Sequence, residues 1–244
     1  MRHVVIGTFL SLALWTAACK QPPLTTSSSV TTTSEGEETE APSGARAAHQ
    51  GSALVRLVNA DPGGNGMDII WGNDKFFSNV PYKSVTPYLE APRGPAIFRL
   101  RAAGGSEDLS AGNRELLIGR HYTLVALPKD KGGTRLAILS DSLGLLEPGE
   151  ARVRLINATT GVDDLDLFIA GTPNLILHGI DAGTVTATSF ADMEGGTVEI
   201  RSPSRPAPTL VKAVKVEADR LSTFIVVGTA SALDVVQIVD RTES

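Results

Sequence analysis

ARVRLINA, at residues 151–158, is nearly a copy of ALVRLVNA, at residues 53–60. Six of the eight positions are identical, and a seventh exchanges Val58 for Ile156. The two stretches start 98 residues apart, and the correspondence continues at nearly the same spacing through later positions: Arg101 with Arg201, Thr123 with Thr223, and Asp141 with Asp240. Solenoid repeats have periods of roughly 20–50 residues. The longer period here predicts two tandem copies of a whole domain.

Each copy is a series of short segments rich in β-branched residues, separated by Gly, Pro, Asn or Asp. VRLVN at 55–59 and MDIIW at 67–71 are typical strands. Seven or eight such strands per copy, with turns every 8–12 residues or so, are typical of a β-sandwich. The predicted fold class is all-β, with two tandem immunoglobulin-like β-sandwich domains at residues 51–142 and 150–242 after a disordered N-terminal tether.

The N-terminus has the pattern of an export signal over residues 1–18. The apolar run from Val4 to Trp15 is shorter than the ~20 residues that a membrane-spanning helix needs. Cys19 is the only cysteine, and it ends the sequence Thr16-Ala17-Ala18-Cys19. This ending resembles the lipobox of bacterial lipoproteins, although Thr16 stands where that pattern usually carries Leu. The alternative is a plain signal peptide with an incidental cysteine.

The lipobox resemblance implies that Cys19 is lipidated and anchors the exported protein in the cell envelope, where two or three acyl chains hold firmly. By the same resemblance, Lys20 favours the outer membrane of a Gram-negative bacterium. Residues 19–50 contain almost nothing apolar, and nine of the ten residues in 25–34 are Ser or Thr. Such a segment is expected to be a disordered tether with a span of roughly 30 Å.

Composition excludes several classes of function. The formal net charge is −5, so no basic surface is available to follow a phosphate backbone, and nucleic-acid binding is not expected. A single cysteine rules out an intramolecular disulfide and a cysteine metal cluster. No metal-ligand spacing and no nucleophile motif is recognisable in the sequence. We therefore expect no metal, no cofactor and no catalytic residues.

The opening ARVRLINA and ALVRLVNA, followed in the first copy by Asn79-Val80-Pro81-Tyr82 and by Pro92 and Gly94, resemble the bacterial domain-of-unknown-function family numbered four-three-nine-seven. The resemblance covers residues 53–241. The second copy departs from it, with Thr159-Thr160 in place of Asp61-Pro62 and His178-Gly179-Ile180-Asp181 in place of the Asn-Val-Pro-Tyr turn. The resemblance implies an exported β-sandwich module of bacterial surface proteins, without an activity that could be transferred.

Two kinds of residue are candidates for a special role. Arg56 and Arg154 occupy equivalent places on apolar strands, and Asp68 and Asp166 recur with them as natural partners. We interpret these four residues as structural ion pairs. Aromatic residues gather in the first copy and are mostly replaced in the second, which makes a possible ligand surface of Trp71, Phe76, Tyr82 and Tyr88. The competing interpretation is that these side chains pack in the core and turns.

The sequence thus predicts a membrane-anchored envelope protein with a non-catalytic binding or structural role, whose partner is an envelope protein or a polysaccharide. One alternative is a carbohydrate-binding module that uses the aromatic residues of the first copy. Another alternative is an enzyme with a site between the two sandwiches, for which a carboxylate pair or a nucleophile–base pair would have to converge.

Overall fold

The computed structural model describes residues 51–63, 66–129, 131–141, 144, 146–183, 190–203 and 209–241. The predicted signal peptide (1–18), the predicted lipidation site Cys19 and the predicted tether (19–50) lie outside these residues. The strands all belong to one compact unit, Arg46–Ser244.

Every regular element among the described residues is a β-strand, and there are sixteen. The first eight, which we call sandwich 1, are β1 (Ser52–Asn59), β2 (Met67–Trp71), β3 (Asp74–Val80), β4 (Leu89–Pro92), β5 (Gly94–Ala102), β6 (Ser110–Leu116), β7 (His121–Pro128) and β8 (Thr134–Ser140). The other eight, sandwich 2, are β9 (Glu150–Thr160), β10 (Asp166–Ile169), β11 (Leu175–Leu177), β12 (Phe190–Glu194), β13 (Gly196–Ser202), β14 (Thr209–Val216), β15 (Arg220–Thr229) and β16 (Ala232–Arg241).

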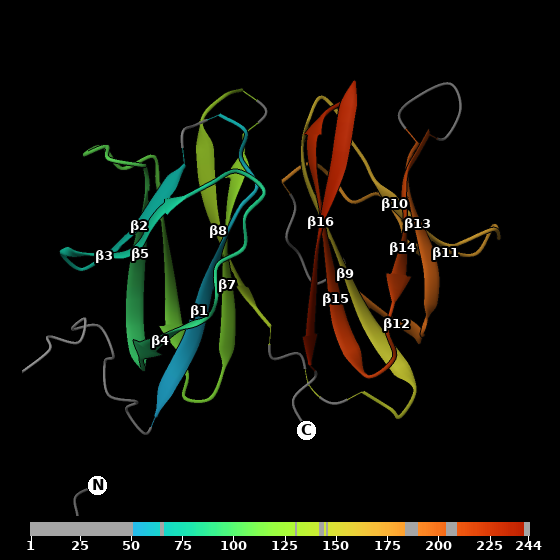
Figure 1. Cartoon of the computed structure of the whole chain (residues 1–244), viewed down its shortest axis with the longest axis horizontal. Coiled ribbons are helices and arrows are strands. Elements are labelled where there is room, and N and C mark those ends of the chain that lie inside the picture. The colour runs from blue at the N-terminus through green and yellow to red at the C-terminus, as the bar shows by residue number, and fades with distance from the viewer. Residues whose placement is uncertain are drawn as a thin grey trace, which may run out of the picture. The chain divides into compact units, whose positions relative to one another are not determined.

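The strands form four sheets of four strands each, two per sandwich (Figure 1). Sandwich 1 consists of the sheets β4-β1-β7-β8 and β3-β2-β5-β6, and sandwich 2 of β12-β9-β15-β16 and β11-β10-β13-β14. Adding eight to each label of the first pair gives the second pair, so the two sandwiches have the same topology. The all-β fold with two sandwiches, predicted from the strand pattern, is confirmed.

The two repeated stretches, residues 53–60 and 151–158, form most of the central strands β1 and β9. Both strands pair in parallel with a late strand of their own sandwich, β1 with β7 and β9 with β15. Because successive side chains of a strand point to opposite faces, Val55 and Leu57 face the core of sandwich 1, while Val153 and Leu155 face that of sandwich 2. The intervening residues point to the outer faces of the same sheets.

Each sandwich encloses a core of its own between its two sheets. Leu57, Ile69, Phe98 and Leu124 are fully buried in the first. The second contains the equally buried Leu155, Leu167, Ile200 and Phe224. No helix within the described part of the chain has the length and apolarity needed to cross a membrane.

Candidate functional site

A third buried cluster lies on the outer faces of two sheets, one from each sandwich. Its members come from β1 and the residue after it, β7 and β8 of sandwich 1, and from β9, β15 and β16 of sandwich 2. We call them the interface cluster: Val58, Ala60, Val125, Leu127, Ala137, Leu139, Ile156, Ala158, Ile225, Val227 and Ile238. This contact explains why β1 and β9 are buried on both faces and lack the inside–outside alternation of a half-exposed strand.

A charged network borders the interface cluster, and Arg56 of β1 is its first centre. The guanidinium of Arg56 forms a two-pronged contact with Asp240 of β16, with nitrogen–oxygen distances of 2.8 and 2.5 Å. Its Nε donates to Thr123 Oγ1 at 2.8 Å, and the Thr123 hydroxyl donates to Asp141 at 2.5 Å. Arg56 thus joins a carboxylate of sandwich 2 to a hydroxyl of sandwich 1.

Arg154 of β9 is the second centre, and like Arg56 it binds an aspartate of the other sandwich and a threonine of its own. Its Nη2 donates to Asp141 of sandwich 1 at 2.6 Å, and its Nε donates to Thr223 of sandwich 2 at 3.0 Å. The side chain of Arg154 is 1% exposed and that of Asp141 is 2% exposed. Removal of two charges from water is expensive, so a pair this deeply buried requires good geometry and further hydrogen bonds. Those hydrogen bonds come from Thr123 and from the hydroxyl of Tyr88, which donates to Asp141 at 3.0 Å.

The surroundings shift the pKa values of two members of the network, Arg56 and Tyr88. Burial by itself would lower the pKa of Arg56, but the carboxylates of Asp240 and Asp141 raise it above its ordinary value. Burial and the neighbouring Asp141 carboxylate raise the pKa of Tyr88 well above its ordinary range. The Tyr88 phenol therefore stays a donor at physiological pH. Its ring also lies 4.5 Å from the Arg56 guanidinium carbon, as in a cation–π contact.

The structure corrects the predicted partners of the two arginines. Arg56 does not pair with Asp68, nor Arg154 with Asp166. The reason is the alternation of strand side chains: Arg56 points to the outer face of its sheet, while Asp68 belongs to β2 in the opposite sheet. The same relation separates Arg154 from Asp166 of β10.

Asp68 and Asp166 share a different role. Asp68 accepts hydrogen bonds from Lys75 Nζ and from the backbone N–H of Asn79, both at 2.7 Å. Asp166 contacts His178 Nδ1 and accepts from the backbone N–H of Gly179, both at 2.9 Å. Asn79 and Gly179 both have positive φ angles, 48° and 61°. The two aspartates therefore hold equivalent left-handed turns within their own sandwiches.

The four aromatic residues singled out in the sequence do not form one surface. Trp71 and Phe76 pack in edge-to-face geometry with ring centroids 5.4 Å apart, against the core of sandwich 1. Tyr82 packs on the interface cluster, and Tyr88 belongs to the charged network. This arrangement favours the interpretation of core and turn packing over a shared ligand surface.

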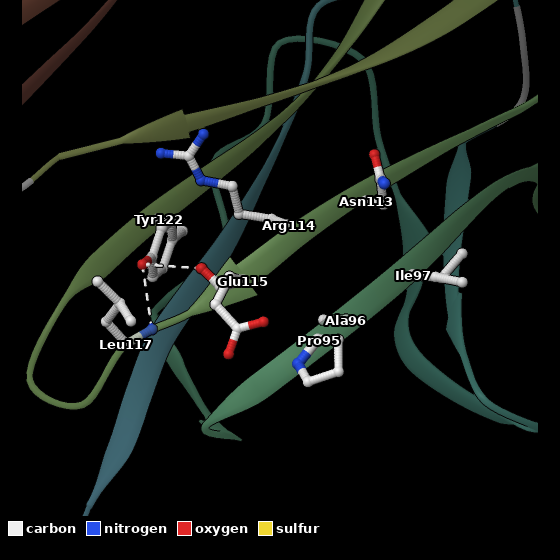
Figure 2. A pocket seen from close by; sticks show the side chains of 8 residues that line it. All are labelled: Pro95, Ala96, Ile97, Asn113, Arg114, Glu115, Leu117 and Tyr122. Carbon is white, nitrogen blue, oxygen red and sulfur yellow. Dashed lines mark hydrogen bonds between the residues drawn. The ribbon is translucent and has the colours of Figure 1, made fainter. Parts of the chain in front are cut away.

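A separate open pocket of about 570 Å³ lies over β5 and β6 (Figure 2). Apolar side chains of Pro95, Ala96, Ile97 and Leu117 line it together with Tyr122 and the polar side chains of Asn113, Arg114 and Glu115. The Tyr122 hydroxyl accepts from the Leu117 N–H at 3.1 Å and donates to the Glu115 carbonyl at 3.3 Å. The Tyr122 hydroxyl thus links β7 to the end of β6 through hydrogen bonds with two backbone groups.

The described residues contain no group of three or more His, Cys, Asp or Glu side chains that could hold a metal ion. Asp164 and Asp181 do come together in sandwich 2. Their hydrogen bond, together with burial and repulsion between carboxylates, raises the pKa of Asp164 above its ordinary value.

No role was predicted for Asp141, Asp240, Thr123 and Thr223, although the sequence shows the correspondence of Asp141 with Asp240 and of Thr123 with Thr223. The signal was the joint recurrence of Arg, Thr and Asp at nearly constant spacing. That recurrence does not reveal that each arginine binds an aspartate of the other sandwich. Both copies contain an arginine and an aspartate at matching positions, whichever aspartate each arginine contacts.

The family model described as "Domain of unknown function (DUF4397)" matches residues 53–168. This range spans sandwich 1 and the beginning of sandwich 2, so this part of the chain is similar to the family. The resemblance deduced from the opening motif and the Asn79–Tyr82 turn is confirmed there. The equivalence of the two sandwiches rests on their strand orders and recurring contacts.

Two solved structures are similar to the chain only at low level. One is a leucine-rich repeat protein from Bacteroides thetaiotaomicron VPI-5482, with 13% identity, 71% of this chain and 25% of that chain covered, and a TM-score of 0.17. The other is described as a "putative cell adhesion protein" from Bacteroides ovatus ATCC 8483, with 5% identity, coverages of 79% and 97%, and a TM-score of 0.23. The chain spans about a quarter of the first protein. No curated protein matches the sequence.

Proposed function

We propose that this protein is a non-catalytic module of a bacterial cell envelope, in which two sandwiches act as one rigid unit that presents a surface to an envelope protein or a polysaccharide. The observation that carries the proposal is the charged network. Arg56, Arg154 and Asp141 are buried ionisable groups, the type of residue that often marks a catalytic site. Here Arg154 binds Asp141 across the interface, and Arg56 binds Asp240 across it.

The interface gives the module its mechanical property. The apolar interface cluster excludes water on the outer faces of two sheets, and the charged network fixes their register at its border. Arginine–carboxylate forks require a defined geometry, so they resist sliding and rotation of one sandwich on the other. Two domains linked this way transmit force and orientation as a single body.

The N-terminal residues support the anchoring part of the proposal. Cys19 lies at the end of the lipobox-like stretch, and Lys20 follows it. The Ser-, Thr- and Glu-rich tether then separates the acylated residue from β1. We propose that the protein is exported, lipidated at Cys19 and held at the outer membrane of a Gram-negative bacterium.

Substitution of the lipidated residue tests the anchor. Cys19→Ser is expected to abolish acyl labelling and to move the protein from the membrane to the soluble fraction. Thr16→Leu completes the usual lipobox pattern and is the matched control, expected to increase the processed fraction. If Cys19→Ser leaves both acylation and fractionation unchanged, the lipoprotein interpretation is wrong.

The role of the folded part is tested by crosslinking the tagged, full-length protein in its native host, followed by mass spectrometry. Recovery of one dominant envelope protein supports an accessory role in an assembly. Recovery of polysaccharide alone supports a glycan-binding role. Detection of a covalent intermediate between the protein and a small-molecule substrate would refute the non-catalytic proposal.

A further inference from the structure

The interface between the sandwiches pairs equivalent positions reciprocally. Arg56 of sandwich 1 binds Asp240 of sandwich 2, and Arg154, which corresponds to Arg56, binds Asp141, which corresponds to Asp240. An interface in which position i contacts j and j contacts i is isologous, the type found between the two halves of a twofold-symmetric dimer.

The apolar contacts follow the same rule. The interface cluster contains both members of five equivalent pairs, including Val58 with Ile156, Val125 with Ile225, and Leu139 with Ile238. Strand register supports the last correspondence, since Thr123 pairs with Leu139 in sandwich 1 and Thr223 with Ile238 in sandwich 2. The eleventh member is Ala137, and its counterpart Val236 packs against the cluster. Each sandwich therefore contributes the same patch.

We propose that the outer face of the β4-β1-β7-β8 sheet is a self-complementary pairing surface, and that Lys83, Arg135 and Asp234 make it select sandwich 2 of its own chain over sandwich 1 of a second copy of this chain. The proposal goes beyond the proposed function, because it assigns a partner and specificity residues to this face. It does not depend on lipidation or on the identity of any envelope partner.

One asymmetric contact carries the specificity. Lys83 Nζ lies 2.8 Å from Asp234 Oδ2 across the interface. The residue of sandwich 1 that corresponds to Asp234 is Arg135, because Leu127 pairs with Arg135 on β8 as Val227 pairs with Asp234 on β16. In a pair of two sandwich 1 faces, Lys83 would meet Arg135, and like charges would repel.

At the reciprocal position sandwich 2 has a glycine, which carries no side-chain charge. Gly183 corresponds to Lys83, since the Lys83 N–H donates to the Asn59 carbonyl and the Gly183 N–H donates to the Asn157 carbonyl. A Cβ atom added to Gly183 would lie 2.9 Å from Arg135 Nη2, so Arg135 sits directly over this glycine. The intrachain pair therefore contains one attraction and no repulsion at these positions. A pair of two sandwich 1 faces contains two repulsions.

The test uses the full mature chain with Cys19→Ser, in which Ile225→Asp and Asp240→Arg disable the face of sandwich 2. This opened chain exposes the face of sandwich 1, and Trp71 fluorescence verifies that sandwich 1 is folded. Its dimerisation is measured by analytical ultracentrifugation, with and without Arg135→Asp, and with Arg135→Lys as the matched control.

Arg135→Asp converts two repulsions into two attractions, so we expect the dimer dissociation constant to fall about tenfold or more, with no comparable fall for Arg135→Lys. Adding Val125→Asp should abolish the dimer. The proposal is overturned if the Arg135→Asp chain stays monomeric, if Arg135→Lys dimerises equally well, or if Val125→Asp leaves the dimer intact.

A second measurement covers the case in which the opened chain does not fold. In the otherwise unaltered chain, Asp234→Lys should destabilise the interface, and the charge-reversed pair Lys83→Asp with Asp234→Lys should restore it. If the double variant is no more stable than Asp234→Lys alone, positions 83 and 234 do not select the partner.

Discussion

Replacement of Arg154 by methionine should destabilise sandwich 1, although Arg154 belongs to sandwich 2. The substitution keeps an unbranched apolar stem and removes the guanidinium that binds Asp141 at 2.6 Å. Asp141 directly follows β8, the last strand of sandwich 1, and its side chain is 2% exposed. Without the Arg154 guanidinium it would remain a buried carboxylate with one neighbouring cation fewer. The damage is therefore expected on both sides of the interface.

The burial of the pair sets the size of the effect. Breaking a buried ion pair by removal of one partner costs about 3–5 kcal/mol. The lower end applies here, because Thr123 and Tyr88 continue to donate to Asp141. We expect a loss of about 3 kcal/mol in the free energy of unfolding.

Arg152→Met is the matched control on the same strand. Arg152 pairs with Asp192 within sandwich 2, and the side chains of this pair are 17% and 39% exposed. Exposed pairs contribute at most about 1 kcal/mol. The control therefore removes the same chemical group from an ion pair within sandwich 2, where little loss is expected.

Urea denaturation followed by two probes separates the sandwiches. Trp71 is the only tryptophan after Trp15 and reports on sandwich 1, while far-ultraviolet circular dichroism reports on both sandwiches. Arg154→Met should lower the midpoint seen by Trp71, and Arg152→Met should leave it nearly unchanged. If Arg154→Met leaves the Trp71 transition unchanged, the charged network does not couple the stability of the two sandwiches.

Four further predictions concern single sandwiches. Ser222→Ala should leave stability unchanged or raise it by about 1 kcal/mol in thermal denaturation, because Ser222 Oγ is buried without a hydrogen-bond partner among the described residues. Tyr122→Phe should lower stability by about 1 kcal/mol in the same assay, because it removes the hydroxyl that bonds to Leu117 and Glu115. Burial raises the pKa of Asp68, but Lys75 and two backbone N–H groups lower it by more, so the pKa in the folded protein is depressed. The stabilisation that results is present above the unfolded-state pKa and is lost as pH falls. Asp68→Asn should therefore flatten the loss of stability on acid titration below about pH 4. Trp71→Ala should destabilise sandwich 1 by ~3 kcal/mol in urea denaturation followed by circular dichroism, and a stable variant that loses retention on a polysaccharide column would instead favour the carbohydrate-binding alternative.

The repeated stretch contains much of the fold in a form that sequence alone reveals. Val55 and Leu57 alternate with polar or outward residues as a strand requires, and their copies Val153 and Leu155 do the same. The buried Asn59 amide donates to the Val80 carbonyl and the Asn157 amide to that of Ile180, which ties β1 and β9 to equivalent turns. Local alternation and turn chemistry are short-range properties, so the all-β fold and its two sandwiches could be predicted.

The same stretch also contains the residues for which prediction failed. Arg56 stood out as a charge on an apolar strand, and Asp68 was its nearest recurring acid in the sequence. In the folded protein the strand alternation turns Arg56 away from Asp68 and toward Asp240, 184 residues further along the chain. A sequence records the residue types of an ion pair, but it does not record which surfaces come into contact.

The sequence by itself determined the strand pattern, the recurrence of one unit and the presence of arginine, threonine and aspartate at matching places in both. Only the tertiary structure decided that these residues exchange partners between sandwiches, that Tyr82 and Tyr88 lie at an interface, and that Trp71 packs on a core. The physical reason is that strand formation depends on neighbours in the chain, whereas the packing of one sheet face on another depends on the shape and charge of the two assembled surfaces.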